Sequence, residues 1–422
     1  MSASPPVGRG LSRAAGDGRP AAPIRLAHLG LGNFFRAHQA WYTDQAPDAE
    51  EWGIAAFSGR STNVPRSLTA QGGLYTLITR AADRDRFDVL SSITRAHAGT
   101  EHAAWLGFLA SPDIRAVTIT VTEAGYVRAA DGGLDRHRPQ VQADVAVLRS
   151  DLTAMVSTTP ARLVAGFAAR RRADAGPLTV IPCDNLPDNG AVSTRVVREL
   201  AEMVDPSLVG WIDESVSYVT TVVDRITPRT TREDLQAVLD ATGARDRCPV
   251  GTEPFHEWVL SGVFPGGRPR WDHAGATLAE DIEPYEQRKL WLLNGAHSLL
   301  AYAGSARGHQ TVAEAVVDET CRAWMEQWWA EATRHLNLLA TVIDAYRAAL
   351  LDRFANPKMH HRLAQIAADG SQKLPVRILP VLRTERAEGR MPQGAARVLA
   401  AWVCHLRGIG VPVDDVDAGA MV

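Results

Sequence analysis

Short apolar runs and segments with helical spacing alternate through the first two thirds of the chain. Apolar runs predict strands at residues 24–29, 52–57, 74–79, 87–93, 116–121 and 178–183, with a hairpin across residues 83–86. Helical spacing falls between them, at residues 39–44, 103–109, 141–156 and 161–172. This alternation predicts an α/β fold with a doubly wound, Rossmann-type domain and a mainly parallel sheet.

The pattern becomes mostly helical after a glycine- and proline-rich stretch at residues 264–269. Helices are predicted at residues 283–303, 311–339, 341–354, 360–369, 375–387 and 393–406. The first 23 residues are rich in Ala, Gly, Pro, Ser and Arg and contain no apolar segment, which predicts a disordered tail. We therefore expect a tail over residues 1–23, a dinucleotide-binding Rossmann-type domain over 24–275 and a mostly α-helical substrate and catalytic domain over 276–422.

Composition narrows the class of protein. The 422 residues are 45% hydrophobic and 22% charged, which is typical of a soluble globular protein with two domains. A net charge of −3 gives no electrostatic reason to expect a nucleic acid or an anionic membrane as partner. The four cysteines lie far apart in the sequence, so no CxxC-type zinc site is present, and their scarcity fits a reducing cytoplasm. We expect a cytoplasmic, metal-independent monomer or homodimer.

Lysine is rare in this chain. The 45 basic residues comprise 42 arginines and only three lysines: Lys289, Lys358 and Lys373. Arginine does not give up its proton at accessible pH, whereas a desolvated lysine can. A retained lysine is therefore a candidate for proton transfer, although three lysines can also survive by chance.

The first predicted strand ends in Gly30-Leu31-Gly32, and a predicted helix follows. Glycines at such a turn let the backbone approach a pyrophosphate at the helix N-terminus. The third glycine of the usual fingerprint is missing, because Phe35 stands in its place. Many tight strand-to-helix turns share this pattern, so by itself it is a weak sign of cofactor binding.

The second predicted strand ends in Ser58-Gly59-Arg60. An acidic residue usually stands at this point and binds the adenosine ribose of NAD. Arg60 is able to meet the 2′-phosphate of NADP instead, which leaves NADP open. A solvated loop charge is the alternative interpretation of Arg60.

Residues 285–298, which read YEQRKLWLLNGAHS, carry the strongest concentration of chemical groups. On an α-helix, four polar residues fall within an arc of about 140°: Glu286, Lys289, Asn294 and His297. Apolar side chains cover much of the remaining surface. One helix face would therefore present a carboxylate, an amine, an amide and an imidazole.

Such a face suits hydride transfer from an alcohol carbon. That reaction needs a base for the hydroxyl proton and hydrogen-bond donors aimed at the oxygen as charge develops there. Lys289 with a depressed pKa can be the base, Asn294 and His297 the donors, and Glu286 a proton relay. A solvated polar face is one alternative. Another is a reductase site built on Tyr285 and Lys289, although the glycine pattern of short-chain reductases is absent.

Three further segments carry candidate site residues. Cys183-Asp184-Asn185 and Val223-Asp224-Arg225 each end an apolar run, where ligands bind in sheets of this type. An Asx turn and a structural ion pair are the respective alternatives. In the segment 354–377, Lys373 follows a Gly-Ser turn, and its ammonium suits a sugar hydroxyl or a carboxylate.

Seven segments, in order, resemble the long-chain mannitol dehydrogenase family. They are GLGNFFRAHQAWYTD, TEAGY, CDNLPDNG, VDRITP, EPFHEWV, the K-x4-N-x2-H pattern of Lys289–His297, and FANP with DGSQKLP. The matches run from Gly30 to beyond Arg377, and seven ordered matches are far more specific than one glycine turn. The family includes mannitol 2-dehydrogenase, arabinitol dehydrogenase, fructuronate reductase and tagaturonate reductase.

The resemblance implies a Rossmann-type N-terminal domain, a helical C-terminal domain and metal-independent hydride transfer, usually with NAD. The catalytic residues that it implies are Lys289 as base, Asn294 and His297 as the oxyanion-binding pair, Glu286 as proton relay and Asn185 as a further active-site residue. The cofactor-binding candidates on its motifs are Gly30, Gly32, Asn33, Phe34, Glu123 and Asp224. Arg60, at the end of the second predicted strand, is a further candidate.

Two positions depart from the family pattern. Phe35 replaces a histidine, which affects the shape of the cofactor turn but not the fold. Gln365 stands where mannitol 2-dehydrogenases have an arginine, and with DGSQKLP it resembles the fructuronate reductase branch. The expected substrate is thus a polyol or an aldonate, such as D-mannitol or D-mannonate, interconverted with D-fructose or D-fructuronate. The substrate-binding candidates are Asn185, Arg362, Gln365 and Lys373. A catalytically inactive sugar- or cofactor-binding protein on the same fold is the alternative.

Overall fold

The computed structural model describes residues 8–59, 61–359 and 361–416. The chain divides into two compact units. The first comprises Met1–Arg80 and Asp85–Ile282, and the second comprises Glu283–Val422 with the short segment Ala81–Arg84. The division at residue 282 lies a few residues after the boundary predicted near 275.

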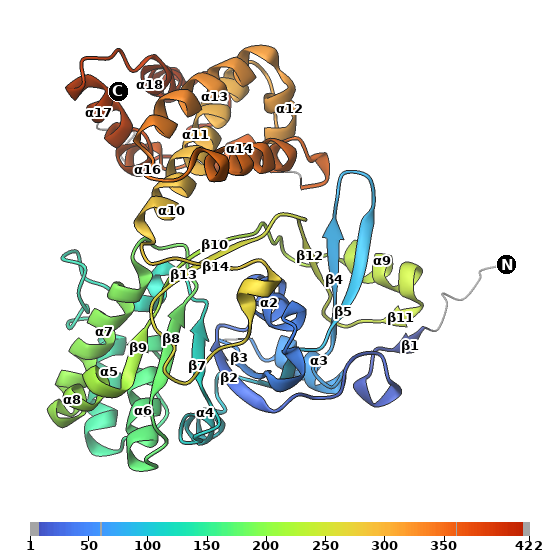
Figure 1. Cartoon of the computed structure of the whole chain (residues 1–422), viewed down its shortest axis with the longest axis vertical. Coiled ribbons are helices and arrows are strands. Elements are labelled where there is room, and N and C mark those ends of the chain that lie inside the picture. The colour runs from blue at the N-terminus through green and yellow to red at the C-terminus, as the bar shows by residue number, and fades with distance from the viewer. Residues whose placement is uncertain (1–7, 60, 360, 417–422) are drawn as a thin grey trace. The chain divides into compact units, whose positions relative to one another are not determined.

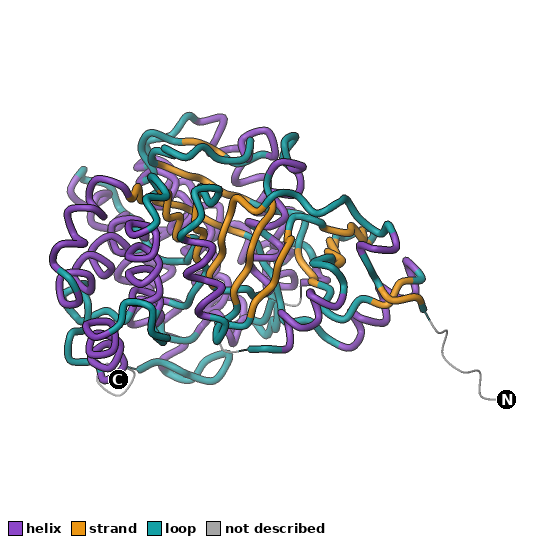
Figure 2. The backbone as a smooth tube through the Cα atoms, turned by 90° about the horizontal axis from the view of Figure 1, so that it is seen from below, coloured by secondary structure: helices purple, strands orange, loops and turns teal. Residues whose placement is uncertain are grey.

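A six-stranded parallel sheet forms the centre of the first unit (Figures 1 and 2). Its strands are β2 (Ile24–Leu29), β3 (Gly53–Phe57), β6 (Ile93–His97), β7 (Ala116–Ile119), β8 (Leu178–Pro182) and β9 (Val216–Tyr218). They lie in the order β6-β3-β2-β7-β8-β9, and every neighbouring pair is parallel. This is the strand order of a Rossmann-type domain, so the predicted fold class is confirmed for this unit.

Nine α-helices of the first unit lie between or after these strands, within the residues that the structure describes. They are α1 (Asn33–Ala37), α2 (Gln39–Gln45), α3 (Asn63–Ala70), α4 (His102–Leu109), α5 (Pro139–Ser150), α6 (Thr159–Arg172), α7 (Asn189–Val204), α8 (Pro206–Ser215) and α9 (Arg232–Thr242). Figure 1 shows α5 to α8 grouped beside β8 and β9, at one end of the sheet. The helices α1, α3, α7, α8 and α9 are additions to the elements that the hydrophobic pattern predicts.

Side chains alternate between the two faces of the large sheet. In β2, Ala27 and Leu29 belong to one hydrophobic core and Leu26 belongs to the other. In β3, Phe57 and Ile54 divide in the same way. Because both faces are buried, these strands read in the sequence as continuous apolar runs rather than as alternating ones.

Two small sheets complete the first unit. One has the order β12-β4-β5, with β4 (Tyr75–Arg80), β5 (Asp85–Leu90) and β12 (Val250–Thr252); its antiparallel β4-β5 pair confirms the predicted hairpin. The other has the order β10-β13-β14, with β10 (Thr220–Asp224), β13 (Glu257–Ser261) and β14 (Thr277–Leu278). The sequence pattern predicts a loop over residues 253–258. Residues 253–256 are outside any strand, but β13 begins at Glu257, because β10, more than 30 residues earlier, supplies its hydrogen-bond partners.

The N-terminal segment has a defined structure from residue 8 onward, so the prediction of a disordered tail over residues 1–23 is wrong for these residues. β1 (Arg9–Gly10) pairs in parallel with β11 (Ala244–Arg245). Leu11, which follows β1, is buried. A short 3₁₀ helix, η1 (Arg13–Ala15), comes next.

Arg13 supplies the stabilisation that the composition of this segment does not predict. Its guanidinium donates hydrogen bonds to the backbone carbonyls of Gly72 at 2.7 Å, Ser91 at 2.9 Å and Ile93 at 3.0 Å. These partners lie about 60 to 80 residues away along the chain. A composition-based prediction counts apolar residues and cannot register such long-range polar contacts.

The second unit is built of helices, which confirms the predicted C-terminal architecture. They are α10 (Glu283–Arg288), the π-helix η5 (Lys289–Gly295), α11 (Ala296–Leu299), the π-helix η6 (Leu300–Gly304), α12 (Val312–Val317), α13 (Glu319–Ala332), α14 (Ala340–Phe354), α15 (Leu363–Ala367), α16 (Gly370–Arg377), α17 (Leu379–Ala387) and α18 (Gln393–Leu406). The helix predicted over 311–339 is divided at Asp318, which caps the N-terminus of α13. Within the described ranges, no helix combines the length and the apolar character that crossing a membrane requires.

We expect Arg13→Ala to lower the free energy of unfolding by about 1–2 kcal/mol, because four backbone carbonyls, including that of Arg19, lose a charged donor. Equilibrium denaturation in urea measures this loss. Arg9→Ala is the matched control, because Arg9 is mostly exposed and its ion pair with Asp17 is of the kind that contributes little. Equal stability of the Arg13→Ala variant and the wild type would show that the hydrogen bonds of Arg13 contribute nothing to stability.

Candidate functional site

The glycine turn lies at the carboxyl end of β2. Gly30 has a φ of 110°, a conformation that favours glycine. A Cβ atom on Gly30 would stand only 1.8 Å from the carbonyl oxygen of Thr120. The Thr120 hydroxyl also donates to the carbonyl of Gly30 at 2.9 Å. Glycine is therefore required where this turn passes the end of the neighbouring strand, β7.

The buried imidazole of His28 contacts the residues that pack against the glycine turn. The Nδ1 atom of His28 lies 2.8 Å from the Thr118 hydroxyl, and its Nε2 atom lies 3.1 Å from the Thr120 hydroxyl. Burial lowers the pKa of His28 to about 3, so the ring is neutral. Phe35 stacks on this ring with the centroids 3.4 Å apart. The residue that departs from the family pattern thus packs inside the domain, against the strand that carries the turn.

The next three residues of the turn make different contacts. Gly32 is the N-cap of α1, and Phe34 stacks on His38 with ring centroids 5.0 Å apart. The Asn33 amide donates to the carbonyl of Pro228 at 3.0 Å and to the Thr230 hydroxyl at 3.1 Å. Asn33 therefore ties the glycine turn to the loop after β10, which belongs to the VDRITP motif.

A cavity of about 860 Å³ opens at the carboxyl ends of the large sheet. The residues that line it include Gly30, Ser58, Gly99, Thr122, Arg138 and Arg162. Open α/β sheets bind their ligands at this end, and the volume is within the usual range for small-molecule sites. This cavity is the best candidate in the first unit for a cofactor site.

The three remaining cofactor candidates are Arg60, Glu123 and Asp224. Arg60 lies outside the described residues. The side chain of Glu123 is 74% exposed and stands 3.9 Å from the Arg128 guanidinium. Asp224 is buried at the end of β10, opposite Glu257 in the small sheet.

Two guanidinium groups in the cavity, those of Arg138 and Arg162, are not predicted from the sequence. Arg162 donates to the carbonyl of Gly99 at 2.8 Å, and Arg138 lies just before the N-terminus of α5. No spacing in the sequence connects either arginine with β2. Only the fold brings them to the cavity, so a sequence pattern offers no signal for them.

Asp184 joins two sequence motifs beside the cavity. One carboxylate oxygen accepts a hydrogen bond from the Tyr126 hydroxyl, and the other accepts one from the backbone N–H of Val121 at 2.5 Å. Asp184 is only 6% exposed, and burial raises its pKa to about 7. The contact links the loop after β7 to the loop after β8, where Asn185 is exposed.

Residues 283–304 form a continuous helix that we call the site helix, and it departs from the regular α-helix used in the sequence analysis. Residues 289–295 and 300–304 are π-helical. Hydrogen bonds in a π-helix join residues i and i+5, so residues five apart lie closer to one line along the helix than they would in an α-helix. Lys289 and Asn294 are five apart. The π segment therefore brings the amine and the amide closer in direction than the α-helical prediction does.

The candidate catalytic groups of the site helix differ in burial. Glu286, Lys289 and Asn294 are half-buried, whereas His297 is 8% exposed. The imidazole of His297 lies 4.8 Å from the ring of Phe354, measured between centroids. Single-turn π segments in proteins are often found at functional sites, which agrees with this concentration of polar groups.

Positive and aromatic groups surround His297. Burial lowers the pKa of His297 well below its usual range, and repulsion from His361, Arg353 and Arg377 lowers it further. The imidazole is therefore neutral near pH 7 and keeps one N–H group to donate. His361, Arg353 and Arg377 do not figure among the site residues predicted from the sequence. They lie 56 to 80 residues beyond His297, and only the packing of α14 and α16 shows the relation.

The predicted substrate-binding residues of the second unit, Arg362, Gln365 and Lys373, differ in their surroundings. Arg362 and Gln365 are exposed, and Arg362 pairs through its backbone with Thr311. The Lys373 ammonium donates to the carbonyl of Ala368 and, at 3.4 Å, to that of Ile366. These contacts hold the ammonium against the end of α15 and the loop after it, and a substrate-binding role for Lys373 stays a prediction.

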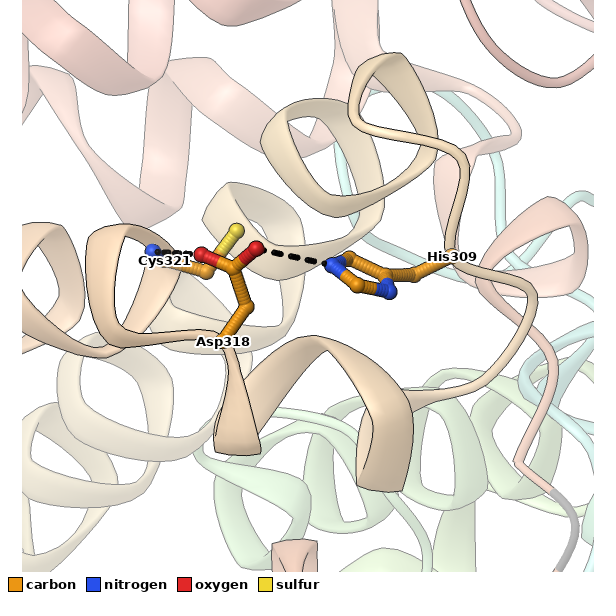
Figure 3. A group of neighbouring side chains, drawn as sticks. All are labelled: His309, Asp318 and Cys321. Carbon is orange, nitrogen blue, oxygen red and sulfur yellow. Dashed lines mark hydrogen bonds and ion pairs between the residues drawn. The ribbon is translucent and has the colours of Figure 1, made fainter.

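One group of possible metal ligands occurs within the described part of the chain. Ligand atoms of His309, Asp318 and Cys321 lie within 4.8 Å of one another, and Figure 3 shows the imidazole and the Cys321 backbone N–H directed at the Asp318 carboxylate. The Arg307 guanidinium stands 2.9 Å from the same carboxylate. Burial raises the pKa of Cys321 to about 11, so a cation would meet a neutral thiol and a repelling arginine. The group is better explained as the N-terminal cap of α13.

The parallel sheet, the glycine turn and the cavity at the strand ends define the first unit as a Rossmann-type domain, joined here to a helical second unit. The chain belongs to the mannitol dehydrogenase family of oxidoreductases: residues 24–273 match the mannitol dehydrogenase Rossmann domain and residues 281–417 match the mannitol dehydrogenase C-terminal domain. The resemblance stated from seven sequence motifs is thereby confirmed.

Three relatives show how closely the chain follows this family. D-mannonate oxidoreductase of Escherichia coli (strain K12) is 36% identical over 406 residues, which cover 93% of this chain and 82% of the relative. Mannitol 2-dehydrogenase of Cereibacter sphaeroides is 33% identical over 421 residues, which cover 97% and 87%. The structure of Pseudomonas fluorescens mannitol 2-dehydrogenase, a ternary complex with NAD and D-mannitol, matches with a TM-score of 0.78 at 33% identity over 94% of this chain and 83% of that one.

We expect Asp184→Asn to change how stability depends on pH. Burial raises the pKa of Asp184 from 3.8 to about 7, so between these values the folded protein holds a proton that the unfolded chain releases. Through Asp184, the wild type therefore loses stability as the pH rises from about 4 to 7, and the asparagine variant lacks this loss. As the pH rises from 4 to 8, the melting temperature of the wild type should therefore fall relative to that of Asp184→Asn.

The control for this measurement is Asp113→Asn, at an exposed aspartate of the same unit. Its melting curve should follow that of the wild type across the pH range. Parallel pH dependences of the wild type and Asp184→Asn would contradict the raised pKa of Asp184.

Proposed function

We propose that the protein is an NAD-dependent oxidoreductase that interconverts a sugar-derived secondary alcohol and its ketone, with Lys289 as general base and without a metal ion. Membership of the mannitol dehydrogenase family supports the class of reaction. The observation that carries the proposal is the site helix, on which a lysine, an amide and a neutral imidazole are brought together.

The cavity of the first unit fits a dinucleotide. Gly30 has no side chain at the end of β2, so a pyrophosphate could approach its backbone closely. Ser58 and Thr122, which carry hydroxyl groups, also line the cavity. The relative from Pseudomonas fluorescens is a complex with NAD. When bound, NAD supplies the acceptor for the hydride. Arg138 and Arg162 are charges that a 2′-phosphate could also use, which leaves NADP open.

In the direction of alcohol oxidation, Lys289 accepts the hydroxyl proton of the substrate. The Asn294 amide and the N–H group of His297 donate hydrogen bonds to that oxygen as negative charge develops on it. A neutral imidazole is suited to this role because it donates one hydrogen bond and keeps its proton. Glu286, nearly one turn before Lys289, passes the proton onward, and Asn185 is a further proposed donor to the substrate.

The surroundings of His297 favour a sugar acid over a neutral polyol. Arg353 and Arg377 both lower the pKa of His297 by repulsion, which means that the potential around the imidazole is positive. A carboxylate offsets such a potential, whereas a hydroxyl group does not. We therefore propose an aldonate such as D-mannonate, with D-fructuronate as its oxidised partner. Arg362 and Gln365 remain proposed contacts of the substrate.

We expect kcat/KM for D-mannonate and D-fructuronate to exceed the values for D-mannitol and D-fructose by roughly 10- to 100-fold, because a hydrogen bond to a charged group contributes about 1.5–3 kcal/mol. A panel that also includes arabinitol, sorbitol and tagaturonate, each measured with NAD and NADP, tests this. A preference for mannitol would contradict the sugar-acid substrate. Absence of activity with every pair would favour a cofactor- or sugar-binding protein, and loss of activity in EDTA would contradict the metal-free mechanism.

We expect Lys289→Ala to lower kcat by about 100- to 10,000-fold, because the proton acceptor is removed. Added primary amines should restore much of the activity, since they can enter the space left by the side chain and accept the proton. Lys358→Ala is the control for the loss of a lysine from this unit and should keep the wild-type rate. Near wild-type turnover by Lys289→Ala would end the proposal that Lys289 is the base.

A further inference from the structure

Two buried indoles donate hydrogen bonds into the backbone of the site helix. Trp328 and Trp329 are neighbours in α13, and both side chains are fully buried. The Nε1–H group of Trp328 donates to the carbonyl of Trp291 at 2.9 Å, and that of Trp329 donates to the carbonyl of Leu292 at 2.8 Å. Both accepting carbonyls lie in the π segment η5.

A third carbonyl of the same segment has two side-chain donors, one from the site helix itself and one from outside it. The carbonyl of Asn294 accepts a hydrogen bond from the Ser298 hydroxyl at 3.1 Å and one from the Arg377 guanidinium at 3.4 Å. Arg377, the last residue of α16, also donates to the Ser298 hydroxyl at 3.2 Å. Donors from α13 and α16 thus reach three carbonyls within four residues of the site helix.

The packing of the site helix on α13 depends on a glycine. A Cβ atom on Gly295 would lie 2.8 to 3.0 Å from atoms of the Trp328 indole, which is too close for a side chain. Gly295 therefore lets the helix backbone approach the indole that bonds to it. The glycine and the tryptophan are complementary parts of one contact, although 33 residues separate them.

The register of this segment decides where the proposed catalytic groups point. In an α-helix, residues five apart differ by about 140° around the axis. A π-helix brings such residues closer in direction, and Lys289 and Asn294, five apart, both lie in the π segment. Groups that insert into the hydrogen-bond ladder of a helix from outside distort it, and π turns are rare in proteins.

We propose that the indoles of Trp328 and Trp329 and the guanidinium of Arg377 are positioning groups that hold the site helix in its π register. They thereby keep the proposed base and the oxyanion donors on one side of the helix. The inference rests on the function proposed above for these residues. Trp329 has a second link to the site, because its ring lies 6.4 Å from Phe354, which packs on His297.

The test removes each donor while keeping the helix otherwise intact. Trp329→Phe and Trp328→Phe keep an aromatic ring and lose the N–H group, and Arg377→Met loses the charged donor. Gly295→Ala disturbs the same contact from the site-helix side. We expect each change to lower kcat by about 100-fold, the cost of a misplacement of about 1 Å. The dissociation constant for NADH should stay within about twofold of the wild-type value, because the proposed cofactor cavity belongs to the other unit.

Trp324→Phe is the matched control. Trp324 lies one turn earlier in α13, its ring faces Arg397 at 5.0 Å, and none of the described hydrogen bonds links it to the site helix. The same substitution at this position should leave kcat and the helix unchanged. A loss of kcat equal to that of Trp329→Phe would overturn the proposal, since it would show a general packing effect.

A crystal structure of each variant reads the register independently of activity. Loss of the π segment together with a fall in kcat supports the proposal. A π segment retained in the Trp→Phe and Arg377→Met variants overturns it, and so does a lost π segment with kcat within twofold of the wild type. If the tryptophan variants do not fold, Arg377→Met, at a half-buried position, decides by the same criteria, with Arg377→Lys expected to restore the register. An inactive wild type would defeat the proposed function alone, because the structures would still test the register.

Discussion

The close contact between Gly30 and Thr120 is the constraint on which the candidate cofactor site depends. A backbone that passes another strand end at this distance leaves no room for a Cβ atom. The contact persists because the polar groups around it are buried and paired: His28 lies between the hydroxyl groups of Thr118 and Thr120. Moving the turn would leave a buried donor or acceptor unpaired, at a cost of about 1–3 kcal/mol. The open end of the sheet is thus held rigidly where a ligand would meet it.

The need of buried polar groups for hydrogen-bond partners also determines the structure of the second unit. Indole N–H groups are difficult to bury without an acceptor, and the carbonyls of a π segment are suitable acceptors. The tryptophans of α13 therefore stabilise the core and the unusual helix with the same hydrogen bonds. Burial acts on His297 as well, because it keeps the imidazole neutral beside two arginines. In this unit, the proposed arrangement of catalytic groups on the site helix thus follows from the hydrogen bonds that buried polar groups require.

Elements with a strong local pattern could be predicted from the sequence. The ranges predicted for β2 and α18 agree with the structure, because β2 is a short, mostly apolar run and the apolar residues of α18 recur at helical spacing. Elements that depend on distant partners could not be predicted. β13 forms by pairing with β10, and the N-terminal segment is held by the hydrogen bonds of Arg13. For the candidate site, the sequence indicated the residues of the motifs but not the arginines that lie beside them.

The amino-acid sequence by itself determined the family, the α/β and helical halves, and the chemical groups that a dehydrogenase needs, because these are properties of residue type and local spacing. The tertiary structure alone decided how those groups are presented. The sequence gives no sign of a π-helix at Lys289, since its donors come from Trp328 and Arg377, roughly 40 to 90 residues further along the chain. It also gives no sign that Arg138 reaches the cavity. Hydrogen bonds and electrostatic repulsion act through space, and only the folded chain determines which distant residues come within their range.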